Sequence, residues 1–403
     1  MDPKELESMR KSFKTVENKQ NLLKNNPQIL KFKEEVQEIK KNTINRNKEL
    51  QEIAINSFKR NDINVLFASD GKQARDIIFD IISQEDETII AKSKSNTLGE
   101  IGVSKYLGDS RIEVVETDLG DRILQLKENN NKPTHPTGPA SHLNVAQITE
   151  IINNSMNLNI KANAKDIMEV VKKDVKEKIA KCNIGLSGAN AIAADEGSLV
   201  FIHNEGNISL LSLLKIHIVV VGIDKIVNNI EEAIKIAKLE TAYATGSLIT
   251  SYINIVSGPS KTADIEKILL KNMYGAEKVV LILLDNGRVE AIENAKECMW
   301  CIGCGSCIVT CPVYSAIGND FGFNNYLGGR GVVMSKFIED SKTSFDSGLY
   351  KCTLCGLCTL NCPVSIPTSQ VMEKIREMSN NEDLSINNHE TIKENIKNKG
   401  SPY

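Results

Sequence analysis

One stretch decides the fold of the C-terminal region: Cys301-Ile302-Gly303-Cys304-Gly305-Ser306-Cys307-Ile308-Val309-Thr310-Cys311-Pro312. Its cysteine spacing recurs at Cys352, Cys355, Cys358 and Cys362, and the last of these is again followed by proline. Three closely spaced thiolates with a fourth before proline are typical of [4Fe–4S] proteins, because a tight loop then places successive sulfurs on corners of one cluster. The repeated motif therefore predicts two [4Fe–4S] clusters.

The two motifs predict interleaved ligand sets. In two-cluster ferredoxins the fourth cysteine of each motif binds the other cluster. We therefore assign a first thiol set, Cys301, Cys304, Cys307 and Cys362, and a second thiol set, Cys352, Cys355, Cys358 and Cys311. The alternative is two zinc sites, but these usually use two separated Cys-x-x-Cys pairs. Of the remaining cysteines, Cys298 is predicted to be a spare thiol beside the first cluster and Cys182 a buried, inert thiol.

The linker between the motifs, residues 312–351, is predicted to contain a helix at 332–341. A linker of this length resembles that of the α-helical ferredoxin domains in multi-subunit dehydrogenases and reductases. It also contains Gly328-Gly329-Arg330-Gly331. Glycines around one arginine favour a flexible loop, and the alternative is a contact with a partner or an anion.

Upstream of the motifs, residues 61–290 alternate short Val- and Ile-rich runs with longer amphipathic runs. This pattern predicts one large α/β domain with a largely parallel sheet and helices on both faces. The predicted strands are 63–67, 88–92, 112–115, 199–203, 217–221, 253–256 and 279–284, and the predicted helices include 73–82, 144–152, 164–180 and 225–239. Around this domain we predict a solvated arm of two helices at 1–60, a cluster domain at 291–378 with a helix at 369–378, and a polar tail at 379–403.

The composition excludes several classes of protein. The chain has 403 residues, and 49 Lys and Arg against 52 Asp and Glu give a net charge of −3, which argues against a nucleic-acid-binding protein. No run approaches the ~20 apolar residues that span a bilayer, and the charged N-terminus lacks the apolar core of a signal peptide. We therefore predict a cytoplasmic protein, in which cysteines stay reduced and clustered thiols indicate metal.

The α/β region carries several short blocks in a fixed order. They are Lys92-Ser93-Lys94-Ser95, Glu116-Thr117-Asp118-Leu119-Gly120, Leu186-Ser187-Gly188-Ala189-Asn190, Asp195-Glu196-Gly197-Ser198, Asn204-Glu205-Gly206-Asn207, residues 217–225, Ser257-Gly258-Pro259 and Leu284-Asp285-Asn286-Gly287-Arg288. Together with the cysteine motifs, over residues 60–370, they resemble the lactate utilization protein B family, whose N-terminal part is a LUD domain.

The resemblance implies a fold and a function. The LUD domain is similar to the fold shared by ribose-5-phosphate isomerase and the CoA transferases, and an α-helical ferredoxin domain follows it. The family implies an iron–sulfur electron-transfer subunit, an oxidoreductase component that works with protein redox partners in oxidising L-lactate or a related 2-hydroxy acid. No catalytic residue is carried over from the family to this chain.

Three alternatives stay open. Residues 389–403 resemble the connector that precedes CCG domains, which favours an electron-transfer subunit of a heterodisulfide-reductase-like complex whose CCG-domain partner is another polypeptide. The LUD domain could instead be an enzyme acting on a carboxylate, a CoA ester or a sugar phosphate. In the last alternative the chain is a non-catalytic assembly module with structural clusters.

Polar residues beside predicted strands are candidates for a ligand site, since ligands of parallel α/β sheets bind beyond the carboxyl ends of the strands. Lys92, Ser93 and Lys94 predict an anion site, with a plain polar loop as the alternative. The residues that flank the predicted strand 199–203 predict substrate contacts, or else tight turns; they are Glu196, Asn204, Glu205 and Asn207.

Four of the five histidines are predicted to have structural roles only. His203 and His217 belong to predicted strands, where we expect them to be packed and hydrogen-bonded. His135 and His142 are in or near a proline-rich segment at 133–139, where we expect an exposed loop.

Overall fold

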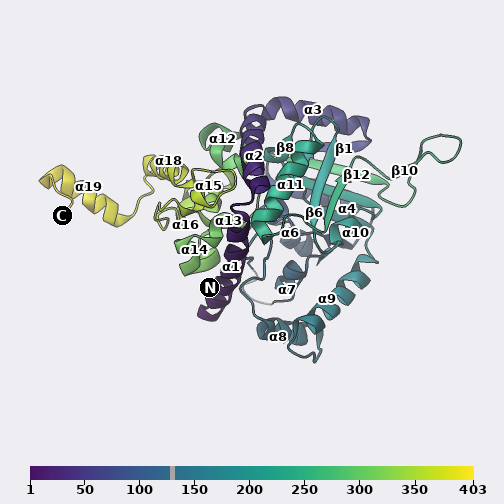
Figure 1. Ribbon diagram of the computed structural model, residues 1–403, viewed down its shortest axis with the longest axis horizontal. Coiled ribbons are helices and arrows are strands. Elements are labelled where there is room, and N and C mark those ends of the chain that lie inside the picture. Colours follow the sequence, from purple (N-terminus) through teal and green to yellow (C-terminus); the bar gives the residue numbers. More distant parts are fainter. Residues whose placement is uncertain (128–131) are drawn as a thin grey trace.

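The computed structural model describes residues 1–127 and 132–403, and a parallel sheet forms its centre (Figure 1). In the described part of the chain this sheet has six strands, and every neighbouring pair is parallel. Their order across the sheet is β1 (Ile63–Ala68), β12 (Lys278–Leu284), β7 (Ile216–Gly222), β4 (Ile184–Ser187), β2 (Ile89–Lys92) and β3 (Glu113–Glu116). This confirms the predicted α/β class.

Both faces of the sheet are covered, and its central strands β7 and β12 are apolar at most positions. Along β7, Ile216 and Ile218 pack on one face with the helices that follow β1 and β2, while Val219 packs on the opposite face with α3 and the second sheet. Successive side chains of a strand point to opposite faces, so a continuous apolar run fills two cores. The helices of this region are α4 (Gly71–Gln84), α5 (Asn96–Glu100), α6 (Val103–Asp109), α7 (Leu119–Leu126), α8 (Val145–Met156), α9 (Ala164–Ile179) and α10 (Asn207–Leu211).

A second, mixed sheet lies beside the first. Its order is β8 (Ile226–Val227), β5 (Ala191–Ala193), β6 (Ser198–His203) and β9 (Tyr252–Val256). The predicted strands 199–203 and 253–256 are therefore present, but they form antiparallel pairs outside the parallel sheet. Helix α11 (Ile230–Thr245) packs on this sheet. It begins later than predicted because residues 223–227 form a 3-10 turn, η1 (Ile223–Lys225), and then β8.

The N-terminal region differs from the predicted solvated arm of two helices. It forms three helices, α1 (Pro3–Leu23), α2 (Pro27–Asn45) and α3 (Asn47–Arg60). Met9 and Phe13 of α1 are buried in one core with Ile29 and Val36 of α2 and with residues of the cysteine motifs. Figure 1 shows α1 and α2 between the α/β region and the C-terminal helices. The solvated arm is therefore wrong, because the apolar faces of these helices cover the cluster region.

The C-terminal region is mostly helical, as predicted. Its elements are α12 (Arg288–Asn294), η2 (Lys296–Trp300), α13 (Ser306–Val309), α14 (Pro312–Ile317), η3 (Gly318–Asp320), α15 (Gly328–Ile338), α16 (Ser341–Asp346), α17 (Leu357–Leu360), α18 (Thr368–Asn381) and α19 (Asn387–Lys399). Short ribbons pair β10 (Lys261–Thr262) with β11 (Leu270–Lys271), and β13 (Gly322–Phe323) with β14 (Tyr326–Leu327). The flexible loop predicted at 328–331 is wrong, because these residues form the first turn of α15.

No helix within the described ranges is long and apolar enough to cross a bilayer. The last helix, α19, has no buried residue and points away from the rest of the molecule (Figure 1).

Candidate functional site

The second thiol set converges on one small hollow. Its four members line this hollow together with Cys307 of the first set and Arg330 of α15; they are Cys311, Cys352, Cys355 and Cys358. Cys311 is the N-cap of α14, Cys352 and Cys355 belong to the loop that leads into α17, and Cys358 lies in α17 itself. Burial, weakened by backbone N–H groups, raises the pKa of Cys311 to about 11, and Cys358 and Cys352 are the thiols that raise it further. Cys311 thus lies with the second motif.

Two members of the first thiol set, one from each motif, also lie near each other. Burial, and next the neighbouring Cys362, raise the pKa of the Cys304 thiol well above its usual value. Asn361, next to Cys362, links the second motif to the first, because its Nδ2 donates to the carbonyl of Ser306 at 2.8 Å. Cys311 of the first motif therefore lies beside the second motif, and Cys362 of the second motif lies near Cys304 of the first.

Cysteine thiols with backbone N–H groups pointing at their sulfurs are a donor set that fits an iron–sulfur cluster. Across residues 1–127 and 132–403, no three His, Cys, Asp or Glu side chains converge closely enough to hold one metal ion. Backbone N–H groups point at the sulfurs instead: Gly303 N donates to Cys301 Sγ, and Tyr314 N to Cys311 Sγ, both at 3.4 Å. Such N–H groups are the contacts that cluster-bound thiolates accept.

The two remaining cysteines lie outside both sets. Cys298 is fully buried beside the first motif, its carbonyl accepts a hydrogen bond from Arg330 Nε at 3.1 Å, and burial raises the pKa of its thiol to about 12. Cys182 follows α9 in the core of the α/β region, where burial raises its pKa to about 11. Both thiols are protonated at neutral pH.

A cavity of about 240 Å³ lies between the α/β region and the first cysteine motif. Residues that follow β2, β3 and β4 line it, as expected at the carboxyl edge of a parallel sheet, and residues that follow β6 of the second sheet line it as well. Helix α11 forms one wall, and Gly303 of the first motif lines the cavity as well. A Cβ on Gly303 would lie 3.5 Å from Glu240 Oε1 and 3.8 Å from Lys225 Nζ.

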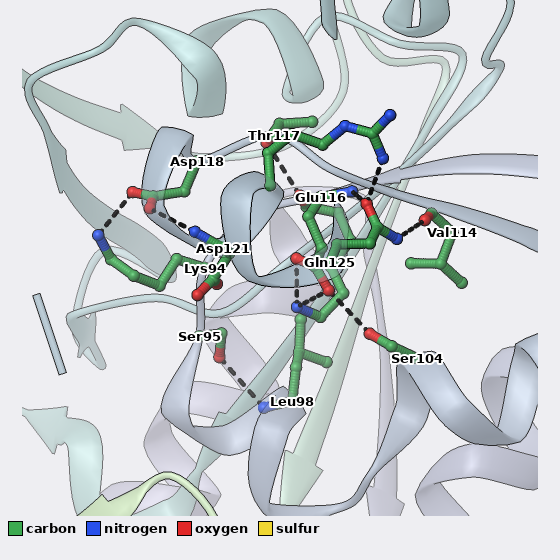
Figure 2. A network of polar contacts seen from close by, with 12 residues as sticks. Lys94, Ser95, Leu98, Ser104, Val114, Glu116, Thr117, Asp118, Asp121 and Gln125 are labelled. Carbon is green, nitrogen blue, oxygen red and sulfur yellow. Dashed lines mark hydrogen bonds and ion pairs between the residues drawn. The ribbon is translucent and has the colours of Figure 1, made fainter. Parts of the chain in front are cut away.

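Four of the seven predicted ligand residues line this cavity. They are Lys94, Asn204, Glu205 and Asn207. Lys94 Nζ pairs with Asp118 Oδ2 at 2.6 Å (Figure 2) and also donates to the carbonyl of Thr137 at 3.0 Å. Partial enclosure, and next the charge of Asp118, raise the pKa of Glu205 to about 7. Because Glu205 is open to water at the rim, solvent screening limits this rise.

The other three candidates do not line the cavity. Lys92 is buried and forms an ion pair with Glu116 at 2.8 Å, facing a separate hollow. Ser104 donates to the same carboxylate at 2.9 Å (Figure 2). Ser93 is fully buried. Glu196, between β5 and β6 in the chain, contacts the N-terminus of α11, where its Oε2 accepts from the backbone N–H of Ile230 at 3.2 Å. Glu196 therefore helps to cap this helix.

Sequence reasoning missed several cavity residues and misplaced two histidines. Lys225, Glu240 and Thr137 line the cavity and were not predicted as site residues. Lys225 ends the 217–225 block, which is the signal that could have found it, whereas Glu240 directly follows the predicted helix 225–239 and stands in no motif. His135 and His142 were expected in an exposed loop and are instead buried, with 4% and 1% of their surface exposed. His203 and His217 are in strands and hydrogen-bonded, as predicted.

A buried ionic network joins the α/β region to the cluster region. Arg288 pairs with Glu100 at 2.7 Å and with Asp224 at 2.6 Å. Tyr326, next to α15, donates its hydroxyl to the same Glu100 at 2.6 Å. Burial favours the neutral form, but Arg288, Lys225 and Lys40 hold the pKa of Asp224 well below its usual value. Arg288 ends the Asp285-Asn286-Gly287-Arg288 block, so this block has a structural role between regions.

Comparisons with known proteins agree with this arrangement. Residues 51–284 match the family described as the LUD domain, and residues 297–366 match the 4Fe-4S dicluster domain. Lactate utilization protein B of Geobacillus sp. (strain WCH70) is 31% identical over 345 residues, which is 85% of this chain and 70% of that protein. The protein of the same name from Bacillus cytotoxicus is 32% identical over 331 residues, 82% of this chain and 67% of that protein.

A solved structure is also similar in part. A DUF162 family protein from Deinococcus radiodurans matches 59% of this chain and 98% of its own, with 13% identity and a TM-score of 0.29. The dicluster match and the paired cysteine motifs support two [4Fe–4S] clusters. A LUD domain followed by a dicluster domain, together with 31% identity to a lactate utilization protein B over 85% of this chain, places the chain in the lactate utilization protein B family.

Proposed function

We propose that this protein is an electron-transfer subunit in the oxidation of L-lactate or a related 2-hydroxy acid. Converting a 2-hydroxy acid to a 2-oxo acid releases two electrons and two protons. Two clusters, each accepting one electron, match that number. The position of Cys311 beside the second motif and of Cys362 near Cys304 carries the proposal, because clusters bound by the two assigned sets would share one core and could exchange electrons.

The partner is another protein with a redox centre. Cys355 is exposed and Leu360, five residues further on, has 79% of its surface exposed, so the second cluster is the one nearer to solvent and to a docked protein. A CCG-domain subunit and a hydroxy-acid dehydrogenase are the two partner classes that the sequence suggests. A cytoplasmic location belongs to the same proposal.

Iron content and spectroscopy test the proposal. Anaerobic reconstitution should give about eight irons per chain, and reduction should give the electron paramagnetic resonance (EPR) signals of two clusters. Cys301→Ser and Cys362→Ser should each remove the same one of the two signals, because both residues belong to the first set. Cys182→Ser is the matched control and should keep both. Stoichiometric zinc without charge-transfer absorption, or loss of different signals in the first two variants, contradicts the proposal.

The cavity favours one second candidate, a LUD-domain enzyme that acts on a carboxylate, CoA ester or sugar phosphate. A rim carboxyl with a raised pKa next to a lysine–aspartate pair suits proton transfer near neutral pH. Turnover of such substrates should fall with Glu205→Gln at unchanged cluster content. Glu196→Gln is the control, since Glu196 lies outside the cavity. Full turnover in Glu205→Gln would reject this candidate.

A further inference from the structure

The imidazole of His135 is one of the buried polar groups that the described contacts leave unexplained. Its ring is buried, with 4% exposed, and Nε2 has no hydrogen-bond partner among the described residues. A buried N–H without a partner is costly, so such a group needs an explanation.

The tautomer of this ring follows from its other nitrogen. The backbone N–H of Thr137 donates to His135 Nδ1 at 3.2 Å, and the Thr137 hydroxyl lies 2.9 Å from the same atom. Because a backbone N–H can only donate, Nδ1 is unprotonated and a neutral ring carries its proton on Nε2. Burial lowers the pKa of His135 to about 4, which keeps the ring neutral.

The protonated edge of the ring faces the first cysteine motif. Gly305 lies between Cys304 and Ser306, and a Cβ on it would be 2.6 Å from His135 Nε2 and 2.8 Å from Cε1. Its φ of +74° and the close ring leave room only for glycine. The motif loop therefore has no side chain between the imidazole edge and its own backbone.

Three contacts hold the histidine segment against the cluster region. The hydroxyl of Tyr314 donates to the carbonyl of Thr134 at 2.8 Å, and Asn319 Nδ2 donates to the carbonyl of Pro133 at 3.3 Å. Phe13 of α1 packs edge-on against the His135 ring, with 5.5 Å between centroids. The ring is thus fixed in place.

We propose that the Nε2–H of His135 donates a hydrogen bond to a sulfur atom of the first cluster. This inference rests on the proposed function, through the assignment of Cys304 to that cluster. A donor to a cluster sulfur stabilises the reduced state, which carries the extra negative charge, and raises the reduction potential. Since Lys94 of the cavity donates to Thr137, the residue that orients the ring, the same segment links the cavity to the cluster.

Redox titration monitored by EPR tests the inference. His135→Leu should lower the potential of one cluster and leave the other unchanged, and His135→Gln, which keeps a donor, should recover most of the loss. A tenfold fall in the reduced-to-oxidised ratio at a fixed potential corresponds to about 59 mV for a one-electron couple. His142→Leu is the control, because this histidine is equally buried and bonds the Thr134 hydroxyl instead.

Wild-type protein labelled with ¹⁵N-histidine gives a second measurement that needs no variant. Pulsed EPR of the reduced protein should show coupling of one cluster to a histidine nitrogen. Unchanged or equally shifted potentials in His135→Leu, or absent histidine coupling in a protein that holds eight irons, overturns the inference alone. A protein without two clusters overturns the proposed function instead.

Discussion

At the scale of single residues, Arg288 is the centre of a buried ionic network. Its guanidinium has 2% of its surface exposed and contacts Glu100, Asp224 and Tyr326. Replacing one member of a buried ionic group leaves the other charges without compensation, whereas an exposed ion pair contributes little. We therefore expect the network to stabilise the contact between the α/β and cluster regions.

Arg288→Met should consequently destabilise the protein by about 3–5 kcal/mol. The measurement is the midpoint of anaerobic urea unfolding followed by circular dichroism, with iron content determined in parallel. Lys172→Met, which breaks the exposed pair with Glu169, is the control and should change stability by less than about 1 kcal/mol. Equal midpoints for the two variants would show that the network adds no stability.

His217 gives a pH dependence of defined sign. Its Nε2 lies 2.8 Å from the Ser187 hydroxyl, and burial lowers the pKa of the ring from 6.5 to about 4. Between these pH values the unfolded chain binds a proton that the folded chain does not, so stability falls as the pH falls. From pH 7.5 to 5.5 the wild type should lose about 1.4 kcal/mol more than His217→Gln.

Comparing the two proteins isolates the histidine from other groups. Burial raises the pKa of Asp121 to about 7, and partial enclosure does the same for Glu205, so these carboxyls change stability in the opposite direction over this range. They are present in both proteins and cancel in the difference. Parallel stability curves for wild type and His217→Gln between pH 7.5 and 5.5 would contradict the argument.

At the scale of elements, the strands with long apolar runs were predicted accurately. Short strands, and the sheet to which a strand belongs, were predicted less well. β7 and β12 were predicted within a residue or two because buried parallel strands are continuously apolar. β4 was missed, because Ile184-Gly185-Leu186-Ser187 is short and carries a glycine and a serine. β6 and β9 were predicted as strands but assigned to the wrong sheet, since strand pairing depends on distant residues.

The N-terminal helices were wrongly predicted to be solvated, for a related reason. Their apolar residues recur at helical spacing, which predicts helices but does not indicate what covers them. In the structure Met9 and Phe13 pack in the same core as cysteines of both motifs, so the apolar face of α1 is buried inside the molecule.

The cysteine loops could be predicted from local sequence spacing alone. The cavity could not, because it depends on residues of α11 that only the folded chain brings to the edge of the sheet.

Helix α1 should therefore protect the clusters. Met9→Ala should destabilise the protein by about 2–5 kcal/mol, because Met9 is fully buried in the core that contains Cys304. The visible absorbance of the clusters should also bleach faster in air. Ile396→Ala in α19 is the control and should stay within about 0.5 kcal/mol of wild type, because Ile396 has 51% of its surface exposed. Equal bleaching rates would contradict a protective role.

At the scale of the whole molecule, the cavity is bounded by both functional regions. The carboxyl edge of the parallel sheet supplies Lys94, and the first cysteine motif supplies Gly303. A charge bound in the cavity would lie near Gly303 of the first motif, and electrostatic interactions near protein groups are stronger than in bulk solvent. The position of the cavity thus predicts that its occupant and the first cluster influence each other.

Small 2-hydroxy and 2-oxo carboxylates should therefore bind in the cavity and change the EPR spectrum of the first reduced cluster. Lys225→Met should weaken this binding, because Lys225 lines the cavity where Gly303 closes it. Lys105→Met is the matched control, since Lys105 lines the separate hollow beside Glu116. Calorimetry measures binding and EPR measures the response. A ligand that binds the wild type at full occupancy and leaves both cluster spectra unchanged would show that the cavity and the cluster act independently.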